Sequence, residues 1–193
     1  MNERGRLFVL AGPSGAGKGT IISRALQSAT HVIPSVSVTT RPPRPTEADG
    51  VHYRFISEED FRSLAERGEL LEWAEVHGHL YGTPREPVAA ALEEGRDVLL
   101  ELDVQGAAQV KEAVPEAVLI FVEPPSLDDL VTRLEARGTE DPAGQARRIK
   151  AAYEEVKAKG NFDYVIVNDV PETAASSLVR ILDSARNDEL RED

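Results

Sequence analysis

The sequence predicts an α/β fold in which a parallel β-sheet carries helices on both faces. Short apolar runs recur along the chain, at residues 7–11, 98–103, 118–122 and 164–167. Because these runs are apolar at nearly every position, we expect strands that are buried on both sides, as in a parallel sheet. Helical patterns lie between the runs, and this alternation is typical of a parallel sheet covered by helices.

Length and composition are those of one globular domain with insertions. The chain has 193 residues, of which 41% are hydrophobic and 29% are charged, an ordinary balance for a soluble protein. The formal net charge is −12, which argues against general attraction to nucleic acid or to an anionic membrane. An acidic protein that binds an anionic ligand must therefore gather its positive charge locally.

The chain contains no cysteine. Disulfides, thiol chemistry and cysteine-based zinc sites are excluded, and this usage is typical of a reducing compartment. The first apolar run is too short for the core of a signal peptide. No run approaches the roughly 20 residues of a membrane span, so we expect a cytoplasmic protein.

The most specific motif is a phosphate-binding loop (P-loop) at residues 12–20, directly after the first apolar run. Its glycines tolerate positive φ, so several backbone N–H groups can converge on one anion. The helix that follows adds its positive N-terminal end, and Lys18 can reach the β- and γ-phosphates. The residues expected to bind ATP are Gly12, Pro13, Ser14, Gly15, Ala16, Gly17, Lys18, Gly19 and Thr20.

The residue after Lys18 departs from the common P-loop. There, a hydroxyl group directly after the lysine binds Mg²⁺, but this chain has Gly19, and the first hydroxyl belongs to Thr20. Two possibilities stay open: Thr20 binds the ion, or phosphates and water hold it. The Lys-Gly-Thr ending resembles nucleoside monophosphate kinases more than the switch GTPases.

Residues 37–84 break the alternation and predict an inserted α+β subdomain. The segment begins with a loop rich in proline and arginine, and Ser57 suits the N-cap of a helix whose first turn is acidic. Short strand-like pieces follow at about 70–76 and 80–83.

A second irregular stretch, residues 136–147, separates two helices and predicts a short lid. Gly138 suits a helix C-cap and Pro142 suits the first turn of the next helix. The parallel-sheet core then consists of residues 1–36, 85–135 and 148–193 within a single 193-residue chain.

Arg41 and Arg44 stand beside several hydroxyl groups in residues 35–44. Each guanidinium offers paired donors that match a phosphate. A solvated basic loop is the alternative for such a segment taken alone, but a P-loop upstream favours a site for a phosphate monoester.

Together these motifs resemble the guanylate kinases. In chain order they are the P-loop, S-x-S-x-T-T-R-x-P-R, G-x-x-Y, L-x-E-W-A, Y-G-T, D-V-Q-G, an arginine-bearing lid and V-N-D, and they run from Gly12 to Asp169. Each motif after the P-loop is weak alone, but this order and spacing are specific. The resemblance implies phosphorylation of GMP and dGMP by ATP, with Mg²⁺ as cofactor and these nucleotides as small-molecule partners, and with no nucleic acid or membrane as partner.

The resemblance also implies how GMP is bound. Guanine presents two N–H donors and one carbonyl acceptor, so a site that recognises it needs a carboxylate beside a hydrogen-bond donor. Glu72 and Thr83 match the family's base readers, and Asp103 matches a further carboxylate near the base. The residues that match the phosphate-binding set are Arg41, Arg44, Tyr53 and Tyr81, with Ser37 beside them.

Cations that stabilise the transferring phosphoryl group form the remaining set. The resemblance implies catalytic roles for Lys18, Arg41, Arg133, Arg137 and Arg148. Arg147 is adjacent to Arg148, so which of the two faces the phosphates stays open. Asn168 follows the last apolar run, at the sheet edge where parallel sheets bind ligands, and the family places it near adenine.

Two other functions are compatible with parts of this pattern. A different P-loop NTPase is one, because residues 103–106 mimic the D-x-x-G motif of switch GTPases; however, no lysine-containing guanine motif follows Asn168. A non-catalytic guanylate-kinase-like binding module is the other, although such modules usually have a degraded P-loop and Lys18 is present here. The sequence leaves the oligomeric state open between monomer and homodimer.

Overall fold

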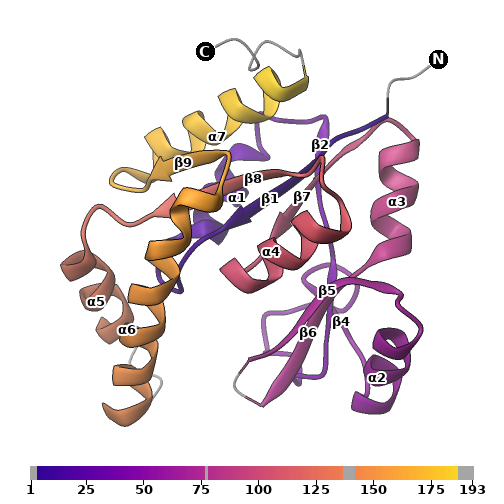
Figure 1. Ribbon diagram of the computed structural model, residues 1–193, viewed down its shortest axis with the longest axis horizontal. Coiled ribbons are helices and arrows are strands. Elements are labelled where there is room, and N and C mark those ends of the chain that lie inside the picture. The colour runs from indigo at the N-terminus through magenta and orange to yellow at the C-terminus, as the bar shows by residue number, and fades with distance from the viewer. Residues whose placement is uncertain (1–3, 77, 137–141, 187–193) are drawn as a thin grey trace.

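The structure is a computed structural model that describes residues 4–76, 78–136 and 142–186, without the side chains of 134–136, 142–148 and 186. It contains a five-stranded parallel sheet with the strand order β2-β7-β1-β8-β9 and a four-stranded mixed sheet with the order β4-β3-β6-β5. The second sheet and the α5–α6 helix pair project from the same side of the core (Figure 1).

The five-stranded sheet forms the core of the molecule and confirms the predicted α/β fold. Its neighbouring strands are all parallel. Its strands are β1 (Leu7–Ala11), β2 (Val32–Pro34), β7 (Asp97–Glu101), β8 (Val118–Glu123) and β9 (Tyr164–Val167).

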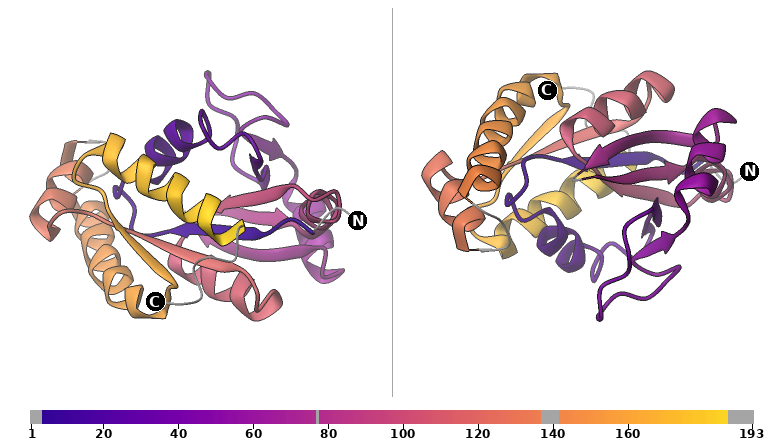
Figure 2. Two further views of the ribbon diagram at one scale, coloured as in Figure 1. Left: turned by 90° about the horizontal axis from the view of Figure 1, so that it is seen from above. Right: turned by 90° about the horizontal axis from the view of Figure 1, so that it is seen from below.

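Helices bury both faces of this sheet. In β1, Phe8 and Leu10 pack toward one set of helices, whereas Leu7, Val9 and Ala11 pack toward the other. Because both faces are covered, β1 is apolar at every position. Figure 2 shows α1 and α4 on opposite sides of the sheet. The first face carries α1 (Lys18–Ala25) and α7 (Pro171–Arg186), and the second carries α3 (Arg85–Glu93) and α4 (Val104–Ala113).

The edge strand β2 was not predicted, because it does not coincide with any of the apolar runs in the sequence. It has three residues, pairs with β7 and ends at Pro34. Proline cannot donate to a sheet ladder and is tolerated at edges. A segment this short has no periodicity that separates it from a loop.

The second sheet has its own small core. Phe61 on the neighbouring helix is fully buried and packs with Val38, Leu70 and Leu80. Ser57 caps that helix as predicted, because its Oγ accepts a hydrogen bond from the Asp60 backbone N–H at 3.1 Å. The elements are β3 (Ser37–Thr39), β4 (Tyr53–Phe55), α2 (Glu58–Glu66), β5 (Leu70–Val76) and β6 (His79–Pro84).

Two helices and a short 3-10 helix complete the chain: α5 (Leu127–Ala136), α6 (Pro142–Lys157) and η1 (Ala158–Asn161). Leu130 and Ala152 are buried between α5 and α6. Residues 137–141 of the predicted lid lie outside the described residues. Among the helices that the structure describes, none combines the length and apolar character needed to cross a membrane.

Candidate active site

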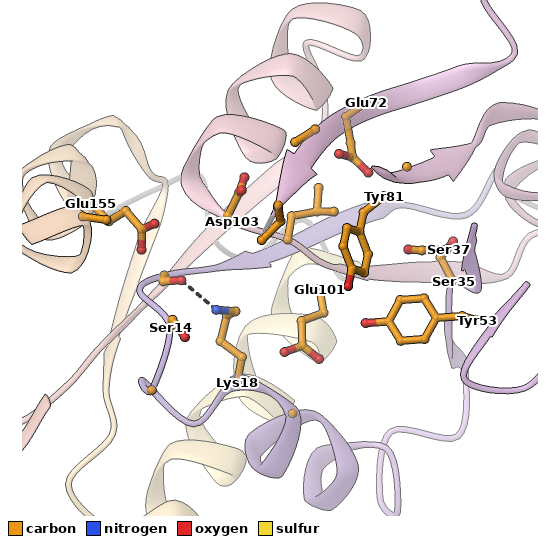
Figure 3. A pocket seen from close by; sticks show the side chains of 18 of the residues that line it. Ser14, Lys18, Ser35, Ser37, Tyr53, Glu72, Tyr81, Glu101, Asp103 and Glu155 are labelled. Carbon is orange, nitrogen blue, oxygen red and sulfur yellow. Dashed lines mark hydrogen bonds between the residues drawn. The ribbon is translucent and has the colours of Figure 1, made fainter. Parts of the chain in front are cut away.

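A cleft of about 1300 Å³ opens at the carboxyl ends of the core strands, between the core sheet and the second sheet. Ligands of open parallel sheets bind at this edge. Figure 3 shows charged and polar side chains from both sheets pointing into the cleft. Its lining includes Gly12, Ser14, Gly15, Gly17, Lys18, Gly19, Thr20, Ser35, Ser37, His52, Tyr53, Glu72, Tyr81, Glu101, Asp103 and Glu155.

The P-loop forms one wall of the cleft. Gly15 and Gly17 have φ values of 89° and 88°, which favour glycine. Gly12 has φ 148°, and a Cβ atom there would lie 2.4 Å from the Val122 carbonyl oxygen. These glycines therefore permit the tight turn that leads into α1.

Asn168 holds the P-loop from behind. Its Nδ2 donates to the Ala16 carbonyl oxygen at 2.7 Å, and its side chain is buried. A Cβ atom on Gly17 would lie 2.4 Å from Nδ2, so the two residues are closely packed. Arg133 donates from Nη2 to the Asn168 carbonyl oxygen at 3.3 Å, which links α5 to the same point. Whether Asn168 also contacts adenine stays a prediction.

Lys18 reaches back over the loop. Its Nζ donates to the Gly12 carbonyl oxygen at 2.7 Å and to that of Pro13 at 3.4 Å (Figure 3). The carboxylates of Glu101 and Glu155 lie near Lys18. Glu101 faces Gly19, since a Cβ atom on that glycine would lie 3.6 Å from Glu101 Oε2. Glu155 comes from α6.

Glu155 extends from α6 toward the P-loop (Figure 3). Burial raises its pKa, while Lys18 and a hydrogen bond from the Ser14 backbone N–H lower it. Its Oε2 is buried without a hydrogen-bond partner among the described residues. Sequence reasoning missed this residue because an acid on an amphipathic helix normally faces solvent.

A buried carboxylate, Glu72, and a half-buried one, Asp103, line another part of the cleft. Thr83 donates from Oγ1 to Glu72 Oε1 at 2.6 Å, and both side chains are buried. Burial raises the pKa of Glu72 to about 7; the charge of Asp103 adds to this rise, and the Thr83 hydrogen bond opposes it. Asp103 accepts from the Gly106 backbone N–H at 2.7 Å and so caps α4.

Arg41 lies beside two cleft residues of the second sheet, Tyr53 and Tyr81, but does not itself line the cleft. Its Nε donates to the Tyr81 hydroxyl at 3.1 Å, and its guanidinium carbon is 5.6 Å from the centre of the Tyr53 ring. Its Nη2 donates to Glu47 Oε1 at 2.8 Å. The neighbouring Arg44 is exposed.

The structure thus brings most of the predicted residues to one cleft. Thr83 lies behind Glu72, and Pro13 and Ala16 are buried within the loop. Arg137 lies outside the described residues, and Arg148 lies on α6 with its side chain outside them. The polar cleft residues that the sequence did not assign are Ser35, His52, Glu75, Glu101 and Glu155. Glu47 was not assigned either, and it lies outside the cleft lining, beside Arg41.

Comparisons with known proteins agree on one family. The family model described as guanylate kinase matches residues 4–185. The guanylate kinase of Thermus thermophilus is 52% identical over 183 residues, covering 95% of this chain and 83% of that protein. That of Clostridioides difficile is 48% identical over 185 residues, covering 96% and 90%. The crystal structure of guanylate kinase from Anaplasma phagocytophilum matches with a TM-score of 0.79 at 33% identity, covering 99% of this chain and 89% of that one.

The raised pKa of Glu72 predicts a pH dependence of stability. The folded-state pKa of about 7 lies above the ordinary value of 4.5, so between these values the folded protein binds more protons than the unfolded chain. The free energy of unfolding therefore falls as pH rises through this window. Relative to Glu72→Gln, the wild type should lose about 2–3 kcal/mol between pH 5 and pH 8 in urea unfolding.

The matched control is Glu59→Gln, which removes an exposed carboxylate from α2. Its free energy of unfolding should stay within about 0.5 kcal/mol of the wild type at both pH values. If the difference between wild type and Glu72→Gln were the same at pH 5 and pH 8, Glu72 would not titrate in this range.

Proposed function

Because the chain belongs to the guanylate kinase family, we propose that it transfers the γ-phosphoryl group of ATP to the phosphate of GMP or dGMP. The products are ADP and GDP or dGDP. The observation that carries this proposal is one cleft that is lined by the P-loop on one side and by Glu72, Tyr53 and Tyr81 on the other. Thr83 supports Glu72 and Arg41 supports Tyr81 through hydrogen bonds from just outside the lining. Two nucleotides bound at these walls would meet phosphate to phosphate.

We assign ATP to the P-loop. The backbone N–H groups of residues 12–20 and the N-terminus of α1 would hold its β- and γ-phosphates. Lys18, which now donates to carbonyl groups of the same loop, would turn to these phosphates. We place adenine near Asn168 and assign residues 136–147 as a lid that closes over ATP.

We assign GMP to the subdomain of residues 37–84. The buried Glu72 carboxylate would accept the two N–H donors of guanine, which adenine does not present together, and Asp103 stands close to it. Tyr53, Tyr81 and the two arginines of the loop would hold the phosphate, with Ser37 beside them. Among the cleft residues that the structure describes, we assign none to the ribose 2′-hydroxyl, so dGMP should also serve.

The chemistry requires positioning more than a strong base. A phosphate monoester is already anionic near neutral pH, so the attacking oxygen needs no general base. Fixed cations would stabilise the charge that spreads over the transferring group. Lys18 lines the cleft and Arg41 lies just behind Tyr81 and Tyr53, and we expect Arg133, Arg137 and Arg148 to approach as the lid excludes water.

The residues near Gly19 fit a Mg²⁺ ion that arrives with ATP. Thr20 supplies a hydroxyl oxygen and Glu101 faces Gly19 with a carboxylate, and hard oxygen donors are those that Mg²⁺ prefers. Among the described residues, no group of three acidic or histidine side chains forms a metal site. We therefore propose that phosphates and water hold most of the ion's coordination shell, and that Mg²⁺ neutralises charge on the transferring phosphates.

We further propose that the protein acts in the cytoplasm, since it contains no cysteine and such usage is typical of a reducing compartment.

The proposed function is tested by supplying ATP and Mg²⁺ with GMP, dGMP, AMP, CMP or UMP and measuring ADP release. Rapid release with GMP and dGMP alone is the expected result. ADP release without any acceptor would indicate an NTPase. No release from a protein that still binds ATP and GMP in calorimetry would indicate a binding module.

Lys18→Met should lower kcat by at least about 100-fold, because one preorganised charge donor to a transition state is worth this much. GMP binding, measured by calorimetry, should change little, since Lys18 belongs to the ATP wall. The control is Lys159→Met, which removes a lysine of the surface pair with Glu123. Turnover by Lys18→Met at the wild-type rate would contradict the role of the P-loop lysine.

Glu72→Gln should reduce the preference for GMP over AMP, because an amide mismatches the donor edge of guanine. Loss of a hydrogen bond to a charged group predicts a drop of about tenfold to hundredfold in the ratio of the two kcat/KM values. Glu59→Gln, on the exposed face of α2, should leave the ratio unchanged. An unaltered ratio in Glu72→Gln would remove this residue from base recognition.

A further inference from the structure

We propose that Glu47 is a positioning residue that holds Arg41 and the loop of residues 41–47 in the geometry that receives the GMP phosphate. This inference rests on the proposed function and deepens its GMP site. Glu47 does not line the cleft, and it acts through the arginine that it holds.

Glu47 closes the loop through both of its carboxylate oxygens. Oε1 accepts from Arg41 Nη2 at 2.8 Å, and Oε2 accepts from the backbone N–H of Arg44 at 2.8 Å. The Glu47 backbone N–H donates in turn to the Arg44 carbonyl oxygen at 2.9 Å. One side chain therefore ties the guanidinium of the first arginine to the backbone of the second.

These contacts fix the orientation of Arg41. Its Nε donates to the Tyr81 hydroxyl, and its Nη1 donates to the Pro42 carbonyl oxygen at 2.7 Å. The guanidinium also lies 5.6 Å from the Tyr53 ring centre and 5.8 Å from that of Phe55. Within the described residues these bonds use three of the five N–H groups, so one N–H on each terminal nitrogen is left for phosphate oxygens.

The pair is sheltered although the loop around it is not. The side chains of Arg41 and Glu47 are 13% and 12% exposed, whereas residues 42–46 are exposed. The hydrogen bonds from Arg41 and from the Arg44 backbone lower the pKa of Glu47 to about 2. The carboxylate therefore stays ionised at neutral pH and can hold the Arg41 guanidinium in place.

A carboxylate on a phosphate-binding arginine could instead compete with the substrate. The positioning role and the competing role differ in what happens to Glu47 when GMP binds. A competitor must leave Arg41, but Glu47 is anchored at its second oxygen by the Arg44 backbone. It also meets Arg41 at one terminal nitrogen only. The geometry thus favours a Glu47 carboxylate that stays bonded to Arg41 beside the bound phosphate.

The test compares wild type, Glu47→Gln, Glu47→Asp and the exposed control Glu59→Gln in steady-state kinetics. Glu47→Gln should raise KM for GMP by about tenfold, the loss typical of one hydrogen bond to a charged group, while KM for ATP changes less than about twofold. Glu47→Asp retains the charge but has a shorter side chain, so its KM for GMP should lie between those of the wild type and Glu47→Gln. Glu59→Gln should match the wild type.

Calorimetry with guanosine separates positioning from damage to the subdomain. Guanosine lacks the phosphate, so Glu47→Gln should bind it as the wild type does while it binds GMP more weakly. Equal weakening of guanosine and GMP would overturn the proposal in favour of a structural role, and an unchanged or lowered KM for GMP would overturn it in favour of no role or of competition. If the wild type itself fails to phosphorylate GMP, the proposed function fails instead.

Discussion

The cleft depends on one electrostatic constraint: a protein with a net charge of −12 must gather the phosphates of two nucleotides. Cations must therefore be held at fixed places against an acidic background. Lys18 is held by carbonyl groups of its own loop, and Arg41 is held by Tyr81 and Glu47. Arg133 is held at the Asn168 carbonyl oxygen. Arg41 is therefore oriented by the chain before any nucleotide arrives, which reduces the ordering that binding requires, whereas Lys18 must exchange its carbonyl partners for phosphate oxygens.

The same cleft concentrates carboxylates whose ionisation is unfavourable in the empty protein. Burial raises the pKa values of Glu72 and Glu155, and a buried Glu155 oxygen has no partner among the described residues. Such acceptors weaken the folded state but are available for the N–H donors of a base or for a bound cation. Binding sites commonly trade stability for function in this way. Under the proposed function, these carboxylates and the held cations would serve the same pair of nucleotides.

The fold class and the P-loop were predictable because their signals are local: continuous apolar runs for a sheet covered on both faces and glycines where positive φ is required. The strand β2 was missed because three residues carry no periodicity. Long-range pairings also escaped prediction. Asn168 bonds to Ala16 across 152 positions, and Glu155 reaches the P-loop from α6. Glu47 reads as an ordinary surface acid until the loop folds back onto Arg41.

The proposed function requires ATP and GMP to bind in one continuous cleft, with the P-loop and the subdomain as its two walls. The most direct measurement is calorimetry with a bisubstrate molecule in which adenosine and guanosine are joined by five phosphates. We expect one molecule to bind per chain, more tightly than either nucleotide, and ATP and GMP each to displace it, because linked ligands gain from effective concentration. Two molecules bound per chain, or displacement by only one of the two nucleotides, would show that ATP and GMP do not share one cleft.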